Sequence, residues 1–290
     1  MILNEMPSLL YEAAKRWYDD KVSVSAAALA YYAIFTIAPM FIFLVTILGM
    51  VFSRADARDW LIVNTAPTFG PEVMQALRIL IENIPDPPTT FIATGLGLIT
   101  LFLGTTGVAI HLKNTFNSIW AVYPKPGGFR KSVVNRLFSF MIVILIGFSL
   151  ILLAVISAVL TAAGLYLDHL APGLEIILNV VDFVITIVLG TVLFAVVFKY
   201  IPDVFIPWGD VWAGSAVTAL LFFIGKLLLG LYFGTDAVSS APGAAGSLVV
   251  IILWIYYSAQ ILFFGAEFIQ VYVKRYGSRK SRKGEWLPDD

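Results

Sequence analysis

The chain has 290 residues, of which 59% are hydrophobic and 13% are charged, and its formal net charge is zero. The composition is too apolar for an ordinary soluble protein, and the balanced charge gives no overall field that would attract nucleic acid or an acidic substrate. The sequence holds no cysteine, which excludes disulfides, thiolate metal ligands and cysteine nucleophiles.

Residues 1–22 come first, with apolar residues at helical spacing between charged ones. This pattern predicts an amphipathic helix. Two placements are open for it. Its apolar face lies either on the membrane surface, as in interfacial helices, or against the underside of a helix bundle.

Six long apolar runs follow, near 23–52, 91–112, 137–165, 175–200, 210–233 and 246–271. A helix needs roughly 20 apolar residues to cross the hydrocarbon core of a bilayer, whereas barrel strands would appear as alternating segments of about ten residues. The chain is therefore predicted to be an all-α polytopic membrane protein, with a six-helix transmembrane domain over residues 23–273. The first run is longer than the apolar core of a signal peptide, so we expect it to remain as the first helix.

The loops divide the basic residues unequally. With both termini on one side, that side holds 15 of the 19 Lys and Arg residues, including the six of the basic tail at 274–290, and the other side holds three. Basic residues concentrate in the cytoplasmic loops of membrane proteins. This bias predicts that both termini are cytoplasmic.

Lys226 in the fifth span and Asp182 in the fourth fall at nearly the same predicted depth. A charge inside a bilayer is costly unless it is paired or hydrated. Three interpretations of Lys226 are open: its ammonium group reaches the outer lipid headgroups, it pairs with Asp182, or it contacts a substrate or a lipid headgroup. Gly225 beside it is expected to leave backbone space for such a ligand.

The last span carries three polar residues at helical spacing, Gln260, Glu267 and Gln270, on the face that also holds Tyr256 and Phe263. A polar stripe of this kind must avoid lipid. It serves either hydrogen bonding between helices or a substrate pathway, and both interpretations are kept.

The second span carries a face of small residues that ends in two polar ones: Gly97, Thr100, Gly104, Gly107, His111 and Asn114. Small residues let neighbouring helices approach closely, and the alternative is a cavity wall with His111 and Asn114 at its cytoplasmic mouth. No partner at ligand spacing accompanies His111, so no metal site is expected there. In the first span, Pro39 removes a backbone hydrogen bond and is expected to kink the helix.

An ordered set of short motifs resembles the YihY/BrkB family of bacterial inner-membrane proteins, formerly labelled ribonuclease BN. The motifs are Ser25–Tyr32 with Pro39, Asn117–Trp120, Tyr200–Pro202, Gly225–Lys226 with Tyr232, and Trp254–Tyr257 leading into Gly265–Glu267. The resemblance covers roughly residues 17–273. It implies a six-helix protein of the bacterial inner membrane with a role in transport, for which lipids are one candidate cargo.

The sequence gives no support to an enzyme, a cofactor or a metal centre, because it lacks a His-Glu-x-x-His helix, a G-x-S-x-G elbow and a P-loop, and its acids are scattered. Two functions are weighed. The first is a permease or lipid-handling protein that moves an amphiphilic or anionic substrate along Lys226, Glu267, Gln260, Asp182, His111 and Asn114. The second is a membrane scaffold or assembly factor. Membrane lipids are the expected partners and nucleic acid is not, and a homo-oligomer is left open.

Overall fold

The computed structural model describes residues 2–48, 91–122, 174–233 and 244–276, together with Asp59, Gln75, Arg78 and Ile79. Side chains are described over 5–36, 104–122, 180–229 apart from Asp182, and 249–276. The elements are α1 (Ile2–Asp19), α2 (Val22–Leu48), α5 (Phe91–Ile119), α7 (Leu174–Tyr200), α8 (Trp208–Phe233) and α10 (Ala244–Tyr276). Every element in these ranges is a helix, as predicted.

Helices cover five of the predicted spans, and the span predicted near 137–165 lies outside the described residues. Within the described residues, three stretches are long and apolar enough to cross a membrane, namely Phe183–Tyr200, Trp208–Leu229 and Val249–Tyr276. A shorter apolar helix runs over Val22–Thr36. Helix α5 continues past the apolar run predicted near 91–112 as far as Ile119, and its polar last turns bond to a neighbouring segment.

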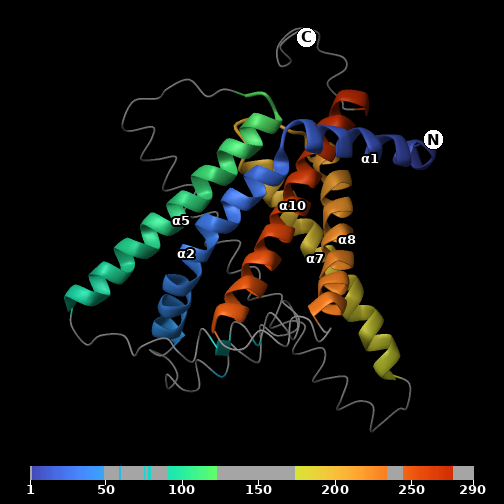
Figure 1. Ribbon diagram of the computed structural model, residues 1–290. Coiled ribbons are helices and arrows are strands. Elements are labelled where there is room, and N and C mark those ends of the chain that lie inside the picture. Colours follow the sequence, from blue (N-terminus) through green and yellow to red (C-terminus); the bar gives the residue numbers. More distant parts are fainter. Residues whose placement is uncertain are drawn as a thin grey trace.

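The five long helices form a bundle with α10 in its middle (Figure 1). On one side of α10 lie α2 and α5, which pack against each other, and on the other side lie α8 and α7. The first residues of α2 and α8 and the last residues of α5, α7 and α10 meet at one end, across which α1 lies. We call it the α1 end. Alternating helix directions place these segments together, as the predicted topology requires.

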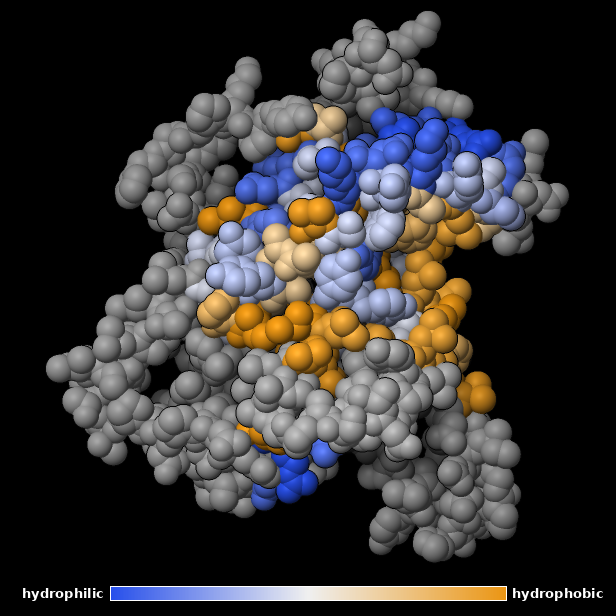
Figure 2. All heavy atoms as spheres, viewed as in Figure 1, coloured by the Kyte–Doolittle hydropathy of each residue, from blue (hydrophilic) through white to orange (hydrophobic). Residues whose placement is uncertain are grey.

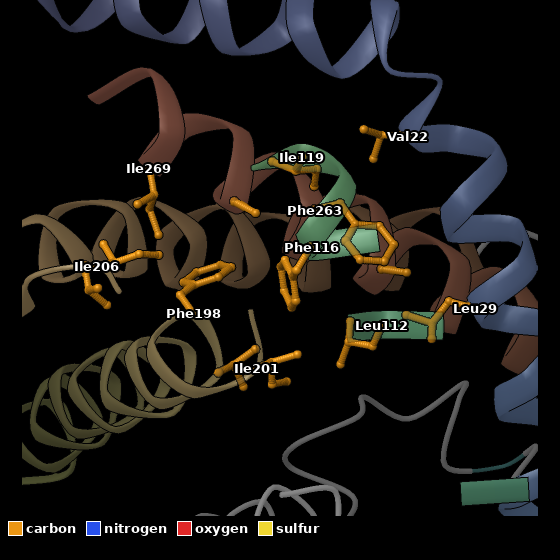
Figure 3. Close-up of a cluster of buried hydrophobic side chains, with 14 of the residues drawn as sticks. Val22, Leu29, Leu112, Phe116, Ile119, Phe198, Ile201, Ile206, Phe263 and Ile269 are labelled. Carbon is orange, nitrogen blue, oxygen red and sulfur yellow. The ribbon is translucent and has the colours of Figure 1, made fainter. Parts of the chain in front are cut away.

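The hydrophobic core lies toward the α1 end and is built around three phenylalanines from three helices (Figure 3). Phe116 of α5 packs edge-to-face on Phe198 of α7 and on Phe263 of α10, with ring centroids 5.8 Å apart in both pairs. Each ring is almost fully buried. Aromatic rings bury more area than other side chains and favour this T-shaped geometry, so this cluster fixes how α5, α7 and α10 meet.

Helix α1 packs against the bundle, as one of its two predicted placements describes. Leu9 and Ala13 have no exposed surface and contact Phe268 and Val271 of α10. The opposite face is exposed and includes Lys15. Figure 2 shows hydrophilic residues along this outward face and hydrophobic ones below it. The apolar face of α1 is therefore used by protein contacts.

Large apolar side chains are exposed along the outside of the bundle. On α7 they include Val184, Val188 and Val192, which follow one another at four-residue intervals and so share one face. On α8 they include Leu220 and Ile224. A soluble protein rarely exposes so continuous an apolar surface, whereas a lipid-facing surface is built in this way.

Candidate functional site

The polar stripe predicted on α10 faces the interior of the bundle. Glu267 has 0% exposure and Gln270 has 5%, while Gln260 is partly buried. Phe263, on the same face, belongs to the hydrophobic core. The stripe is therefore turned toward the bundle interior, the orientation expected of a stripe that avoids lipid.

Gln270 joins three helices at the α1 end. Its Nε2 donates to the carbonyl oxygen of Ile119 at the end of α5, and its Oε1 accepts from Nη1 of Arg16 in α1 at 2.8 Å. These bonds satisfy both ends of a buried amide, which would otherwise be costly. Gln270 thus has the structural role that was one of the two interpretations of the stripe.

Glu267 and Gln260 differ from Gln270 because they contain unsatisfied polar atoms. Within the described part of the chain, neither carboxyl oxygen of Glu267 nor Oε1 of Gln260 has a hydrogen-bond partner. Phe263 lies between them in sequence and packs on Phe116. The polar stripe is therefore interrupted by the aromatic core in this conformation, and a pathway along it requires these rings to move.

A second polar cluster ties the end of α5 to the segment between α7 and α8. Nδ2 of Asn117 donates to Oδ2 of Asp203 at 3.0 Å, and the backbone N–H of Asp203 donates to Oδ1 of Asn117 at 2.8 Å. Lys113 Nζ lies 2.8 Å from the other Asp203 oxygen. We call this cluster the Asn117–Asp203 clamp. Sequence reasoning missed Asp203 and Lys113, although Asn117 and Pro202 both stand in the family motifs.

His111 and Asn114 lie on the second predicted span but do not form a joint site. His111 Nε2 lies 2.9 Å from the carbonyl oxygen of Ser25, which only accepts, so the ring donates from Nε2. Its ring is 5.5 Å from that of Tyr32, and Asn114 is exposed. Searching the described residues finds no group of three or more His, Cys, Asp and Glu that could hold a metal ion.

The predicted small-residue contacts are present at several glycines. A Cβ atom on Gly104 would lie 2.9 Å from Thr36 Oγ1, and one on Gly107 would lie 3.4 Å from the Tyr32 ring. A Cβ atom on Gly265 would overlap the Thr218 hydroxyl. Close approach of α5 to α2, and of α10 to α8, therefore depends on glycine, as expected for small residues in helix interfaces.

The prediction that Gly225 leaves room for a ligand is wrong. A Cβ atom there would overlap the ring and the hydroxyl oxygen of Tyr257, which packs directly on the Gly225 backbone from α10. The small residue therefore admits an aromatic side chain of the protein itself. A glycine in the sequence shows that a helix face lacks a side chain at that position. It does not show which group of a neighbouring helix fills the space.

The backbone places residues 182 and 226 at the same level of two packed helices. The ring centroids of Phe183 in α7 and Phe223 in α8 are 4.8 Å apart, and Gly190 of α7 lies near Ala219 of α8. Because the residue numbers rise on one helix as they fall on the other, α7 and α8 are antiparallel. The side chain of Asp182 lies outside the described residues, and the ion pair stays a prediction. The side chain of Pro39 is likewise outside them, and α2 continues as a helix through this position to Leu48.

Comparison with known proteins identifies one family. The profile named Virulence factor BrkB matches residues 13–287. A UPF0761 membrane protein of Alcanivorax borkumensis is 26% identical over 282 residues, which cover 93% of this chain and 61% of the relative. One of Pseudomonas aeruginosa is 25% identical over 261 residues, covering 88% and 60%.

A third relative, the UPF0761 membrane protein of Rhodospirillum centenum, is 26% identical over 275 residues, covering 91% of this chain and 57% of its own length. The chain therefore spans about three fifths of the length of these three relatives. No solved structure matches the chain.

Proposed function

The chain belongs to the Virulence factor BrkB family of membrane proteins, and from that premise we propose that it moves an amphiphilic or anionic substrate, a lipid being the leading candidate, across the bacterial inner membrane. The proposed protein is a multi-pass permease with both termini in the cytoplasm, and it needs no enzymatic step. Its route follows the interior face of α10 and reaches Lys226 of α8.

The observation that carries this proposal is the unsatisfied polar interior of α10. A scaffold gains nothing from burying a carboxyl group and an amide oxygen without partners, because each such group lowers stability. A permease needs polar groups that substrate or water satisfies in another conformation. The interruption at Phe263 fits a closed state in which the route is not continuous.

Lys226→Met is expected to give a stable protein that fails in transport, because methionine keeps the apolar stem and removes the charge that meets an anionic headgroup. Leaflet-resolved lipidomics of cells that express the wild type, the variant or neither protein would measure this. Lys15→Met, at an exposed position of α1, is the matched control and should behave as the wild type.

The other interpretations of Lys226 give different results. If Lys226 pairs with Asp182, Lys226→Met should lower the thermal unfolding midpoint, and adding Asp182→Asn should restore it because no carboxylate is then stranded. Full activity in a stable Lys226→Met protein would rule out a role in substrate contact. A lipid distribution that is the same with and without the protein would favour the scaffold.

The proposed orientation predicts a labelling pattern for cysteines introduced singly into this cysteine-free chain. Cysteines at Ser53, Ala171 and Ser239, in the loops predicted to face outward, should react with an impermeant maleimide in intact cells. Ser281→Cys in the tail and Ser118→Cys, which is exposed at the α1 end, should react only after the membrane is opened. Labelling of the last two from outside would reverse the orientation.

A further inference from the structure

Glu267 combines complete burial with an unsatisfied carboxyl group. Its side chain has 0% exposure, and neither carboxyl oxygen accepts a hydrogen bond from a donor group in the described ranges. An ionised carboxylate in this position would have neither water nor donors, and such a burial is strongly unfavourable. A bound proton makes the group neutral and removes most of that cost.

A second acid, Asp20, lies in the turn after α1, between Arg16, which donates to Gln270, and Val22, which packs in the core cluster with Ala266. The charged groups that act on Glu267 are Asp20, Arg16 and Lys274, with Asp20 the strongest. Arg16 is already engaged, because its guanidinium donates to Gln270 at 2.8 Å and pairs with Glu12 at 3.4 Å. Two acids at close range favour the state in which one of them keeps a proton.

The described contacts that other helices make with this stretch of α10 include uncharged groups. Thr218 of α8 faces Gly265. Ala26 of α2 and Phe116 of α5 belong to the core cluster that also contains Ala266. The charged surroundings of Glu267 therefore come from α1, the turn after it and the end of α10, and α1 stands between this carboxyl group and the aqueous side.

We propose that Glu267 is a proton-binding site beneath α1 and that Asp20 exchanges this proton with water. Asp20 is exposed at the turn between α1 and α2, so its carboxyl group meets solvent. On release, the proton leaves the carboxyl oxygen of Glu267, binds the Asp20 carboxylate and then passes to a water molecule. Glu267 is left as a carboxylate, and no other reactant is needed. The site does not depend on any transported substrate.

Infrared spectroscopy of the purified full chain in lipid nanodiscs tests the site, because a protonated carboxyl group has a carbonyl stretch that a carboxylate lacks. At neutral pH the wild type should show one such band that Glu267→Gln removes. Asp20→Asn should keep the band but lose it at a lower pH, since the facing negative charge is gone. Asp19→Asn, at the exposed neighbouring position, should titrate as the wild type.

Identical spectra of the wild type and Glu267→Gln at neutral pH would overturn the proton site, because Glu267 would then be ionised. Equal titrations of Asp20→Asn and Asp19→Asn would overturn the role of Asp20. Size-exclusion chromatography checks that Glu267→Gln is folded. If it is not, the titrations of the wild type, Asp20→Asn and Asp19→Asn test the proton site without it, since both substitutions lie on the surface.

Discussion

Valine in place of Gly265 is expected to destabilise the bundle by about 3 kcal/mol, in the upper part of the range for an overfilled core. A Cβ atom at this position would overlap the Thr218 hydroxyl and lie 2.8 Å from Phe198 Cζ. Both neighbours are buried, and Thr218 donates its hydroxyl to the Gly214 carbonyl at 2.7 Å, so neither moves aside easily. The midpoint of thermal unfolding in detergent would record the loss.

Two controls separate this clash from the general effect of a larger residue in a helix. Gly209→Ala adds a Cβ atom where nothing lies within 4 Å, and alanine favours helix over glycine, so this variant should be neutral or slightly more stable. Gly265→Ala should be less destabilising than Gly265→Val. Adding Thr218→Ala to Gly265→Ala should restore part of the lost stability. An unchanged midpoint for Gly265→Val would mean that α8 and α10 do not pack as described.

Leucine in place of Asn117 is expected to destabilise the protein by about 1–3 kcal/mol, because it removes the two hydrogen bonds between the amide and Asp203. The bonds join the amide to the Asp203 backbone N–H and to carboxylate Oδ2, and each typically contributes about 0.5–1.5 kcal/mol, because the Asp203 side chain is 38% exposed and its carboxylate can regain water. Asn117 is itself buried, so water does not readily replace it. A lower thermal unfolding midpoint and faster proteolysis near residues 201–207 should follow.

The lysine of the same clamp should matter much less. Lys113 and Asp203 form an ion pair whose side chains are 20% and 38% exposed, and pairs of this kind contribute less than about 1 kcal/mol. Lys113→Met should therefore change the midpoint only slightly, and Asn114→Leu, at an exposed position of the same helix, should not change it. A larger loss for Lys113→Met than for Asn117→Leu would contradict this account of the clamp.

Helix positions follow from local properties of the sequence, and these were the reliable predictions. Apolar runs and helical spacing located α2, α7, α8 and α10 to within a few residues. The apolar run near 91–112 did not show how far α5 extends. The helix continues past the apolar run as far as Ile119, and its Asn117 finds a partner 86 residues away.

Contacts between distant segments could not be predicted in the same way. The spacing of Gln260, Glu267 and Gln270 showed that they share a face, and burial followed from the cost of polar groups in lipid. The partners of Gln270 required the fold, because Arg16 and Ile119 come from other helices. The prediction of a ligand beside Gly225 was wrong for the same reason. The space there is filled by the Tyr257 ring, which comes from another helix.

The docking of α1 on α10 has a consequence for how the protein is made. Arg16 and its partner Gln270 are 254 residues apart, so the first helix leaves the ribosome long before the helix on which it rests exists. At the usual speed of translation this interval is roughly 10–50 s. During it, Leu9 and Ala13 have no α10 surface to cover them. The docked position of this helix is therefore reached only after α10 has been synthesised, and until then its apolar face needs another surface to cover it.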